Sequence, residues 1–161
     1  MPPFDHLHPA VVHFAIAPLS LAPLLVALGL LWRIQRRGML AAALLVLLIG
    51  LASAVLSLLS GEAAERFARA TPELRSAVQS HEAVARQATL LFAVLTVGLG
   101  AIWLAPRILK KELPQGMERI LLVTWLLISA AGVGLVLRTG HEGGKMVHVL
   151  GTHAQPPPAA M

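Results

Sequence analysis

Residues 39–60 read MLAAALLVLLIGLASAVLSLLS, an apolar run without a single charged side chain. Its length is close to the roughly 20 residues that a helix needs to cross a bilayer. Three further runs of similar character cover residues 9–32, 83–106 and 117–138. The sequence therefore predicts an all-α, four-transmembrane-helix bundle. We expect this bundle to form one domain over residues 1–153, and we expect a disordered tail at 154–161.

The composition excludes several classes of protein. Hydrophobic residues make up 57% of the 161 residues and charged residues only 13%, with a mean hydropathy of +0.74. Soluble domains carry about a quarter charged residues, so an integral membrane protein is predicted. Cysteine is absent, which excludes disulfides, thiolate metal sites and covalently attached c-type haem. The basic residues behind the net charge of +5 lie at predicted helix ends, so nucleic-acid binding is not expected.

Four spans place both chain termini on one side of the membrane. The two short connections carry seven basic side chains and two carboxylates: Arg33, Arg36, Arg37, Arg107, Lys110, Lys111 and Arg119 against Glu112 and Glu118. Because short basic loops stay in the cytoplasm, both termini and the polar segment 61–86 are predicted to face the periplasm of a bacterial inner membrane. That segment is expected to form an amphipathic helix lying at the membrane surface, broken near Thr71 and Pro72.

All seven histidines fall on the predicted periplasmic side: His6, His8, His13, His81, His141, His148 and His153. His13 is set among apolar residues, where an ionisable group is costly and indicates a function by default. His81 and His141 are each followed by a glutamate, and a carboxylate that orients a ring N–H often accompanies a ligating histidine. Each histidine alone could be a helix cap, an interfacial side chain or a hydrogen-bonded polar group. As a set they favour one shared site.

Two chemistries suit that site. A b-type haem could lodge between the helices, with axial imidazoles drawn from His13, His81, His141 and His148 and with Arg86 or Arg138 pairing its propionates. Alternatively, a copper, zinc or iron ion could be coordinated directly by the same four histidines, with His8 as a further candidate. The four-residue spacing of Ser53, Ser57 and Gly61 makes a stripe of small residues. It would let helices pack closely or leave room for a flat ligand.

Two end motifs resemble a bacterial family of four-helix membrane proteins, known mainly as a domain of unknown function. The opening His8-Pro9-Ala10-Val11-Val12-His13-Phe14 resembles its His-Pro-x-x-Val-His-Phe motif, and the stretch from Thr139 to Val147 resembles its closing Gly-His-x-Gly-Gly-x-Leu-Val segment. A histidine that opens the third helix, here His81, also fits. Many members continue with Tyr-x-His-Gly, whereas this chain has His148 at the tyrosine position. Members resemble, or are joined to, Rieske-type or cytochrome c modules, which implies a redox setting.

The leading hypothesis is therefore a cytochrome b-like electron-transfer protein that is not a stand-alone enzyme. It would exchange electrons with a soluble cytochrome, a Rieske-type protein or quinone, and the small-residue stripes are compatible with a homodimer. A metal-binding or metal-transport protein is the alternative, and a structural subunit whose histidines tune packing or pH response is a third. The glycines of the closing stretch are expected to turn the chain back over the bundle mouth, bringing His141 and His148 toward His13 and His81.

Overall fold

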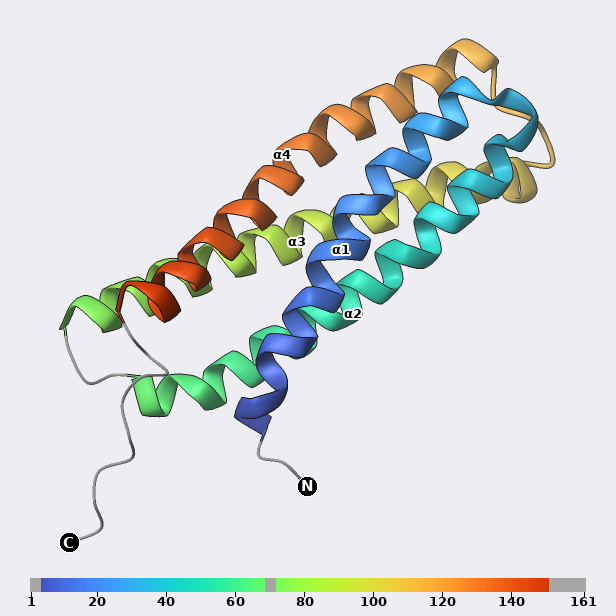
Figure 1. Ribbon diagram of the computed structural model, residues 1–161. Helices are drawn as coiled ribbons and strands as arrows, with labels where there is room; N and C mark the ends of the chain where they lie inside the picture. The colour runs from blue at the N-terminus through green and yellow to red at the C-terminus, as the bar shows by residue number, and fades with distance from the viewer. Residues whose placement is uncertain (1–3, 69–71, 151–161) are drawn as a thin grey trace, which may run out of the picture.

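The computed structural model is all α-helical over the part of the chain that it describes. That part is residues 4–68 and 72–150 for the backbone, and 11–60 and 72–150 for the side chains. Four helices follow one another: α1 (Phe4–Leu31), α2 (Arg36–Ala68), α3 (Pro72–Leu109) and α4 (Gln115–His148). A 3-10 turn, η1 (Arg33–Gln35), links α1 to α2. The helices form an elongated up-and-down bundle (Figure 1), which confirms the predicted fold class.

Successive helices run in opposite directions, so the start of α1 and the end of α4 lie at the same end of the bundle (Figure 1). We call this the histidine end, because the described histidines lie in the helix turns nearest to it: His13, His81, His141 and His148. The opposite end holds η1 and the connection between α3 and α4, and we call it the loop end.

The helices extend beyond the apolar runs that predicted them. Residues 61–68 continue α2 and residues 72–82 open α3, so the expectation of a separate surface helix over 61–86 is wrong. The expected break near Thr71 and Pro72 agrees with the start of α3 at Pro72. Residues 139–148 continue α4, so the expectation that its glycines turn the chain back is also wrong. The physical reason is that adding a residue to an existing helix costs far less than starting a new one. Polar and glycine residues next to a stable apolar helix are therefore drawn into it.

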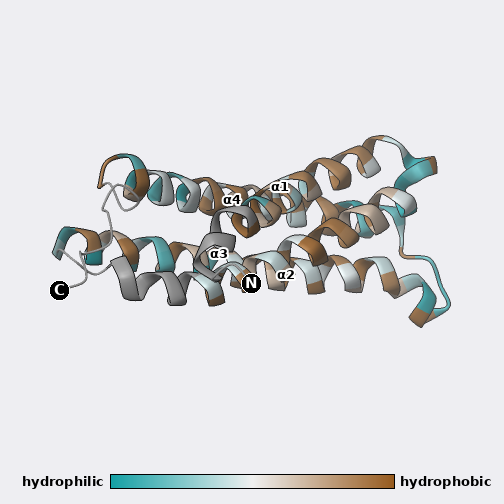
Figure 2. Cartoon of the chain, turned by 60° about the horizontal axis from the view of Figure 1, so that its bottom comes forward, coloured by the Kyte–Doolittle hydropathy of each residue, from teal (hydrophilic) through white to brown (hydrophobic). Residues whose placement is uncertain are grey.

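All four helices are long and apolar enough to span a membrane. Within the apolar window of each, only 28% to 33% of the residues are buried. Many of the other apolar side chains face outward; Leu24, Val94 and Leu127 are 61%, 70% and 71% exposed. Hydrophobic residues, drawn in brown, run along much of the four helices (Figure 2). An apolar surface of this extent would drive association in water, whereas hydrocarbon is a good solvent for it. The bundle is therefore suited to a lipid environment.

Glycines set the closest contacts between helices. A Cβ atom added to Gly50 of α2 would lie 2.8 Å from Leu19 Cγ and 3.2 Å from the Leu19 backbone nitrogen in α1. A Cβ added to Gly132 of α4 would lie 3.0 Å from Phe92 Cε2 in α3. Helices in lipid associate largely by such close packing, because they gain little from the hydrophobic effect. These contacts join α1 to α2 and α3 to α4 as two hairpins.

One buried hydrogen bond reinforces the second hairpin. Trp125 Nε1 of α4 donates to the backbone oxygen of Leu95 in α3 at 2.8 Å. Trp125 is only 4% exposed, so the indole N–H could not otherwise reach water. The neighbouring hydroxyl groups of Thr96 and Ser129 donate to carbonyls of their own helices, at 2.7 Å and 2.8 Å. Each of these polar groups is thus satisfied inside the bundle, as an apolar surrounding requires.

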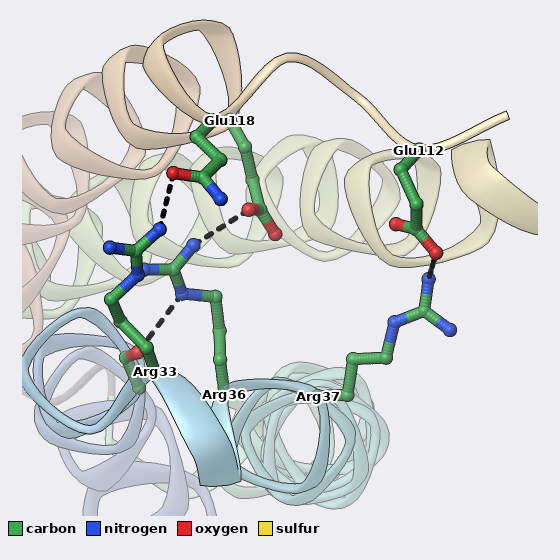
Figure 3. A network of polar contacts seen from close by, with 7 residues as sticks. Arg33, Arg36, Arg37, Glu112 and Glu118 are labelled. Atoms are coloured by element: carbon green, nitrogen blue, oxygen red, sulfur yellow. Dashed lines mark hydrogen bonds and ion pairs between the residues drawn. The ribbon is translucent and has the colours of Figure 1, made fainter.

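Polar side chains tie the two hairpins together at the loop end (Figure 3). Three side-chain pairs cross between them: Arg33 with Gln115, Arg36 with Glu118 at 2.6 Å and Arg37 with Glu112 at 2.7 Å. Trp103 Nε1 of α3 also donates to the Arg37 backbone oxygen at 3.3 Å. Arg36 also donates its Nε to the Gly29 backbone oxygen at 3.1 Å. The Arg36 and Glu118 side chains are 13% and 24% exposed, whereas those of Arg37 and Glu112 are 56% and 77% exposed. The Arg36–Glu118 pair is thus the best shielded from solvent and the strongest of these contacts.

Replacing Gly50 with Ala should destabilise the bundle. The added methyl group clashes with Leu19 and forces α1 away from α2, at a cost of about 1–3 kcal/mol. The measurement is thermal unfolding in detergent, followed by tryptophan fluorescence. Gly98→Ala is the matched control, because a Cβ at Gly98 meets nothing within 4 Å. It should be neutral or slightly stabilising. An equal loss in both variants would contradict the close-contact explanation.

Replacing Glu118 with Gln should also lower the unfolding temperature, because it leaves the shielded guanidinium of Arg36 without its charged partner. A hydrogen bond to a charged group of this kind contributes about 1.5–3 kcal/mol. Glu112→Gln removes the same charge from a solvent-screened pair and should change stability little. The comparison of the two variants in the same unfolding assay checks this, and a larger loss in the Glu112 variant would show that the ranking is wrong.

Candidate functional site

The helix contacts place His13, His81 and Gly143 at one level near the histidine end. A Cβ at Gly140 of α4 would lie 4.0 Å from Ile16 Cδ1 of α1. The two helices run in opposite directions and each rises about 1.5 Å per residue. Three residues nearer the histidine end, His13 of α1 is therefore level with Gly143 of α4. His81 of α3 lies directly against Gly143. Three helices thus contribute to this layer.

His81 is half-buried and fixed against α4. Its Nδ1 lies 3.0 Å from the Thr139 backbone oxygen. A carbonyl oxygen only accepts hydrogen bonds, so Nδ1 carries the proton and Nε2 presents a lone pair. Among the residues that the structure describes, no hydrogen bond engages Nε2. A ring whose Nδ1–H is held by a carbonyl while Nε2 is available has the arrangement of a metal-ligating histidine.

Gly143 makes the space for this ring. A Cβ at Gly143 would lie 3.3 Å from His81 Cε1 and 3.6 Å from Nδ1. The neighbouring Gly144 is different, because a Cβ there meets nothing within 4 Å. A side chain at position 143 would therefore push the imidazole away from the Thr139 oxygen, whereas one at position 144 would not.

The nearby charged groups are already engaged or act at a distance. Glu82 Oε1 pairs with Arg86 Nη2 at 2.6 Å, one helical turn along α3. Arg86, predicted to contact a propionate, is thus an exposed partner of Glu82 in this structure. Glu142 and Glu82 both act electrostatically on His81 without a hydrogen bond to the ring. The orienting group of His81 is therefore the Thr139 carbonyl, not the glutamate that follows it in sequence.

His141 and His148 point away from His81. An α-helix turns by about 100° per residue, so Thr139 and Gly143 share the face toward α3, while residues 141 and 148 lie on the far side of α4. Both histidines are exposed. Together with Gly144, Lys145 and Val149 they line a shallow, open hollow of about 450 Å³. The structure brings His141 and His148 to one hollow, and it does not bring them to His81.

The other predicted site residues are more scattered. His13 and Arg138 are exposed on α1 and α4. The side chains of His6 and His8, and all of His153, lie outside the described residues. Within the described side chains, no group of three or more His, Asp or Glu residues could hold a metal ion. The shared site built from His13, His81, His141 and His148 therefore stays a prediction.

Ser57 adds a polar group at the same end of the bundle. Its hydroxyl oxygen is buried and has no hydrogen-bond partner in the described part of the structure. Gly50 of α2 contacts Leu19 of α1, and the two helices run in opposite directions. Seven residues toward the histidine end from this contact, Ser57 of α2 therefore lies level with Val12 of α1, which precedes His13. A buried hydroxyl without a partner is unfavourable, so this position would gain from a bonded ligand or water.

Thr139 is a residue of this candidate site that the sequence interpretation assigned no role. Its carbonyl holds His81 across 58 positions of sequence. The available signal was the four-residue spacing of Thr139 and Gly143, which puts both on one helical face once α4 is known to continue. The expectation of a turn at the glycines concealed that spacing.

The chain belongs to the family described as "Predicted membrane protein (DUF2231)", whose model matches residues 5–156. The match agrees with four membrane-spanning helices, and the description names no ligand. Neither the curated proteins nor the solved structures gave a match.

Replacing Gly143 with Ala should displace the His81 ring and speed its reaction with diethyl pyrocarbonate severalfold, because the methyl group crowds Cε1 and opens the ring to solvent. Peptide mass spectrometry measures the rate at His81 separately from the other histidines. Gly144→Ala is the matched control and should leave the rate unchanged. Unchanged rates in both variants would show that Gly143 does not position the ring.

Proposed function

We propose that the protein is a membrane electron-transfer protein that holds a b-type haem at the histidine end, with His81 as an axial ligand. The observation that carries this proposal is the bond from His81 Nδ1 to the Thr139 oxygen, which leaves the Nε2 lone pair available. His13 lies at the same end of the bundle as His81, and we propose it as the second axial ligand.

The number of ligands favours haem over a bare metal ion. The porphyrin supplies four nitrogens, so a haem iron needs only one or two protein side chains. A zinc site needs three or four protein ligands. Within the described side chains no such group occurs, whereas His13 and His81 lie at one level of the bundle, which suits two axial ligands. Since His141 and His148 face away from His81, the proposal assigns neither of them to the same haem.

The chain's own residues would bind and orient the group. Thr139 fixes the tautomer and the direction of the His81 ring, and Gly143 allows the ring to approach α4. The apolar helix surfaces below this layer would keep water away from the ligands. A haem with two histidine ligands supplies a one-electron carrier with no open position for oxygen, so transfer between partners is the proposed activity.

The proposal places the histidine end at the periplasmic face of a bacterial inner membrane. This orientation is supported by the excess of basic residues at the loop end. Arg33 begins η1, Arg36 and Arg37 begin α2, and Lys110 and Lys111 follow α3. At that face a soluble electron carrier could approach from water and quinone from the lipid.

Purification in detergent after haem-supplemented expression tests the proposal. The reduced protein should show a Soret band and sharp α and β bands, and a pyridine haemochrome assay should identify b-type haem. His81→Ala should abolish the bands, whereas His148→Ala should retain them, because His148 lies on the other face of α4.

A colourless protein that contains stoichiometric copper, zinc or iron would replace this proposal with the metal-binding alternative. Haem that survives the His81→Ala substitution with an unchanged spectrum would refute the ligand assignment.

A further inference from the structure

A basic stripe on α4 stands apart from the His81 site. Arg138, His141, Lys145 and His148 follow one another at intervals of three, four and three residues. Such spacing keeps all four on one side of an α-helix. Each of the four is exposed. Between Arg138 and Leu150 the sequence contains one carboxylate, Glu142, four residues after Arg138 and three before Lys145. Within the described residues it forms an ion pair with neither.

The stripe has a recess at its centre. Because Gly144 has no side chain and a Cβ there would meet nothing within 4 Å, the helix surface is open at this point. His141, Lys145 and His148 border the resulting hollow, and Val149 gives it an apolar wall. Imidazole and ammonium N–H groups around one recess are the donors that a phosphate oxygen accepts from. No described carboxylate forms an ion pair with Lys145.

The same face continues into apolar surface toward the middle of the bundle. Leu127 lies 14 residues before His141, nearly four full turns, and is 71% exposed. Gly134, between them on this side of the helix, leaves a flat surface, since a Cβ there also meets nothing within 4 Å. An apolar stripe that ends in two cations and two imidazole donors matches the two parts of a phospholipid, its acyl chains and its phosphate.

We propose that this face of α4 binds an anionic phospholipid, with its phosphate held by Lys145, His141 and His148 and assisted by Arg138. The cationic ends of Arg138 and Lys145 also lie near the negative end of the helix dipole, which on its own would explain single cations in the last turns. It does not explain four N–H-donating side chains on one side, beside a hollow that joins an apolar surface. The site is independent of the proposed haem ligands, because it lies on the opposite side of α4.

The test is equilibrium binding of phosphatidylglycerol to the detergent-purified full chain, measured by native mass spectrometry. The double variant Arg138→Gln with Lys145→Gln should bind it at least about fivefold more weakly, as expected from the contribution of a single basic residue near a lipid headgroup. The control removes two exposed cations from the loop end, Lys110→Gln with Lys111→Gln, and should bind as the wild type does. Phosphatidylcholine, whose headgroup has no net charge, should bind weakly to all three proteins.

Equal binding by the two double variants would overturn the proposal, as would equal binding of phosphatidylcholine. Displacement of phosphatidylglycerol by inorganic phosphate alone would show a site for a soluble anion and would also overturn it. The single variant Lys145→Gln provides the same comparison if the double variant does not fold. The haem spectrum of these variants should be unchanged. Lipid binding and haem binding can therefore be tested separately.

Discussion

The hydrogen bonds of the backbone dictate most of this structure. In hydrocarbon no water is available for peptide N–H and C=O groups, so each membrane crossing must satisfy them within its own helix. The side chains are then left to hold the helices together. They do so with close contacts at Gly50 and Gly132 and with two indoles, Trp125 and Trp103, that donate across to backbone oxygens of neighbouring helices. The bundle is thus specified by fit at a few small residues, while most of its apolar surface faces outward.

Those few contacts fix the register of the helices, and the register decides the chemistry at the histidine end. The contact between Gly140 and Ile16 sets the height of His13 relative to α4. The contact of Gly143 with His81 sets the height of α3. Rotation of α4 about its own axis by about 200°, the angle between residues 139 and 141, would turn His141 toward α3 in place of Thr139. The roles of these residues therefore follow from packing in the bundle and could not be assigned from each residue's chemistry alone.

Hydropathy was sufficient to predict the number and positions of the helices, because bilayer-length apolar runs such as residues 39–60 have few alternative folds. The helix ends were not predictable in the same way. Residues 61–68 and 139–148 are polar or rich in glycine, and they are helical because of the helix that precedes them. His81 was also a candidate site residue from the sequence. Its partner, the Thr139 carbonyl, was not, since every residue has a carbonyl and only the fold selects which one is near.

The three polar side-chain pairs at the loop end all run between residues 33–37 of the first hairpin and residues 112–118 of the second. They can therefore form only after both hairpins have entered the membrane with the same orientation. A second hairpin inserted upside down would leave Glu112 and Glu118 across the bilayer from their arginines, with no way to reach them. The network thus stabilises only the arrangement in which both hairpins share one orientation. Its arginines lie in the same short basic connection from which the sequence predicts that orientation.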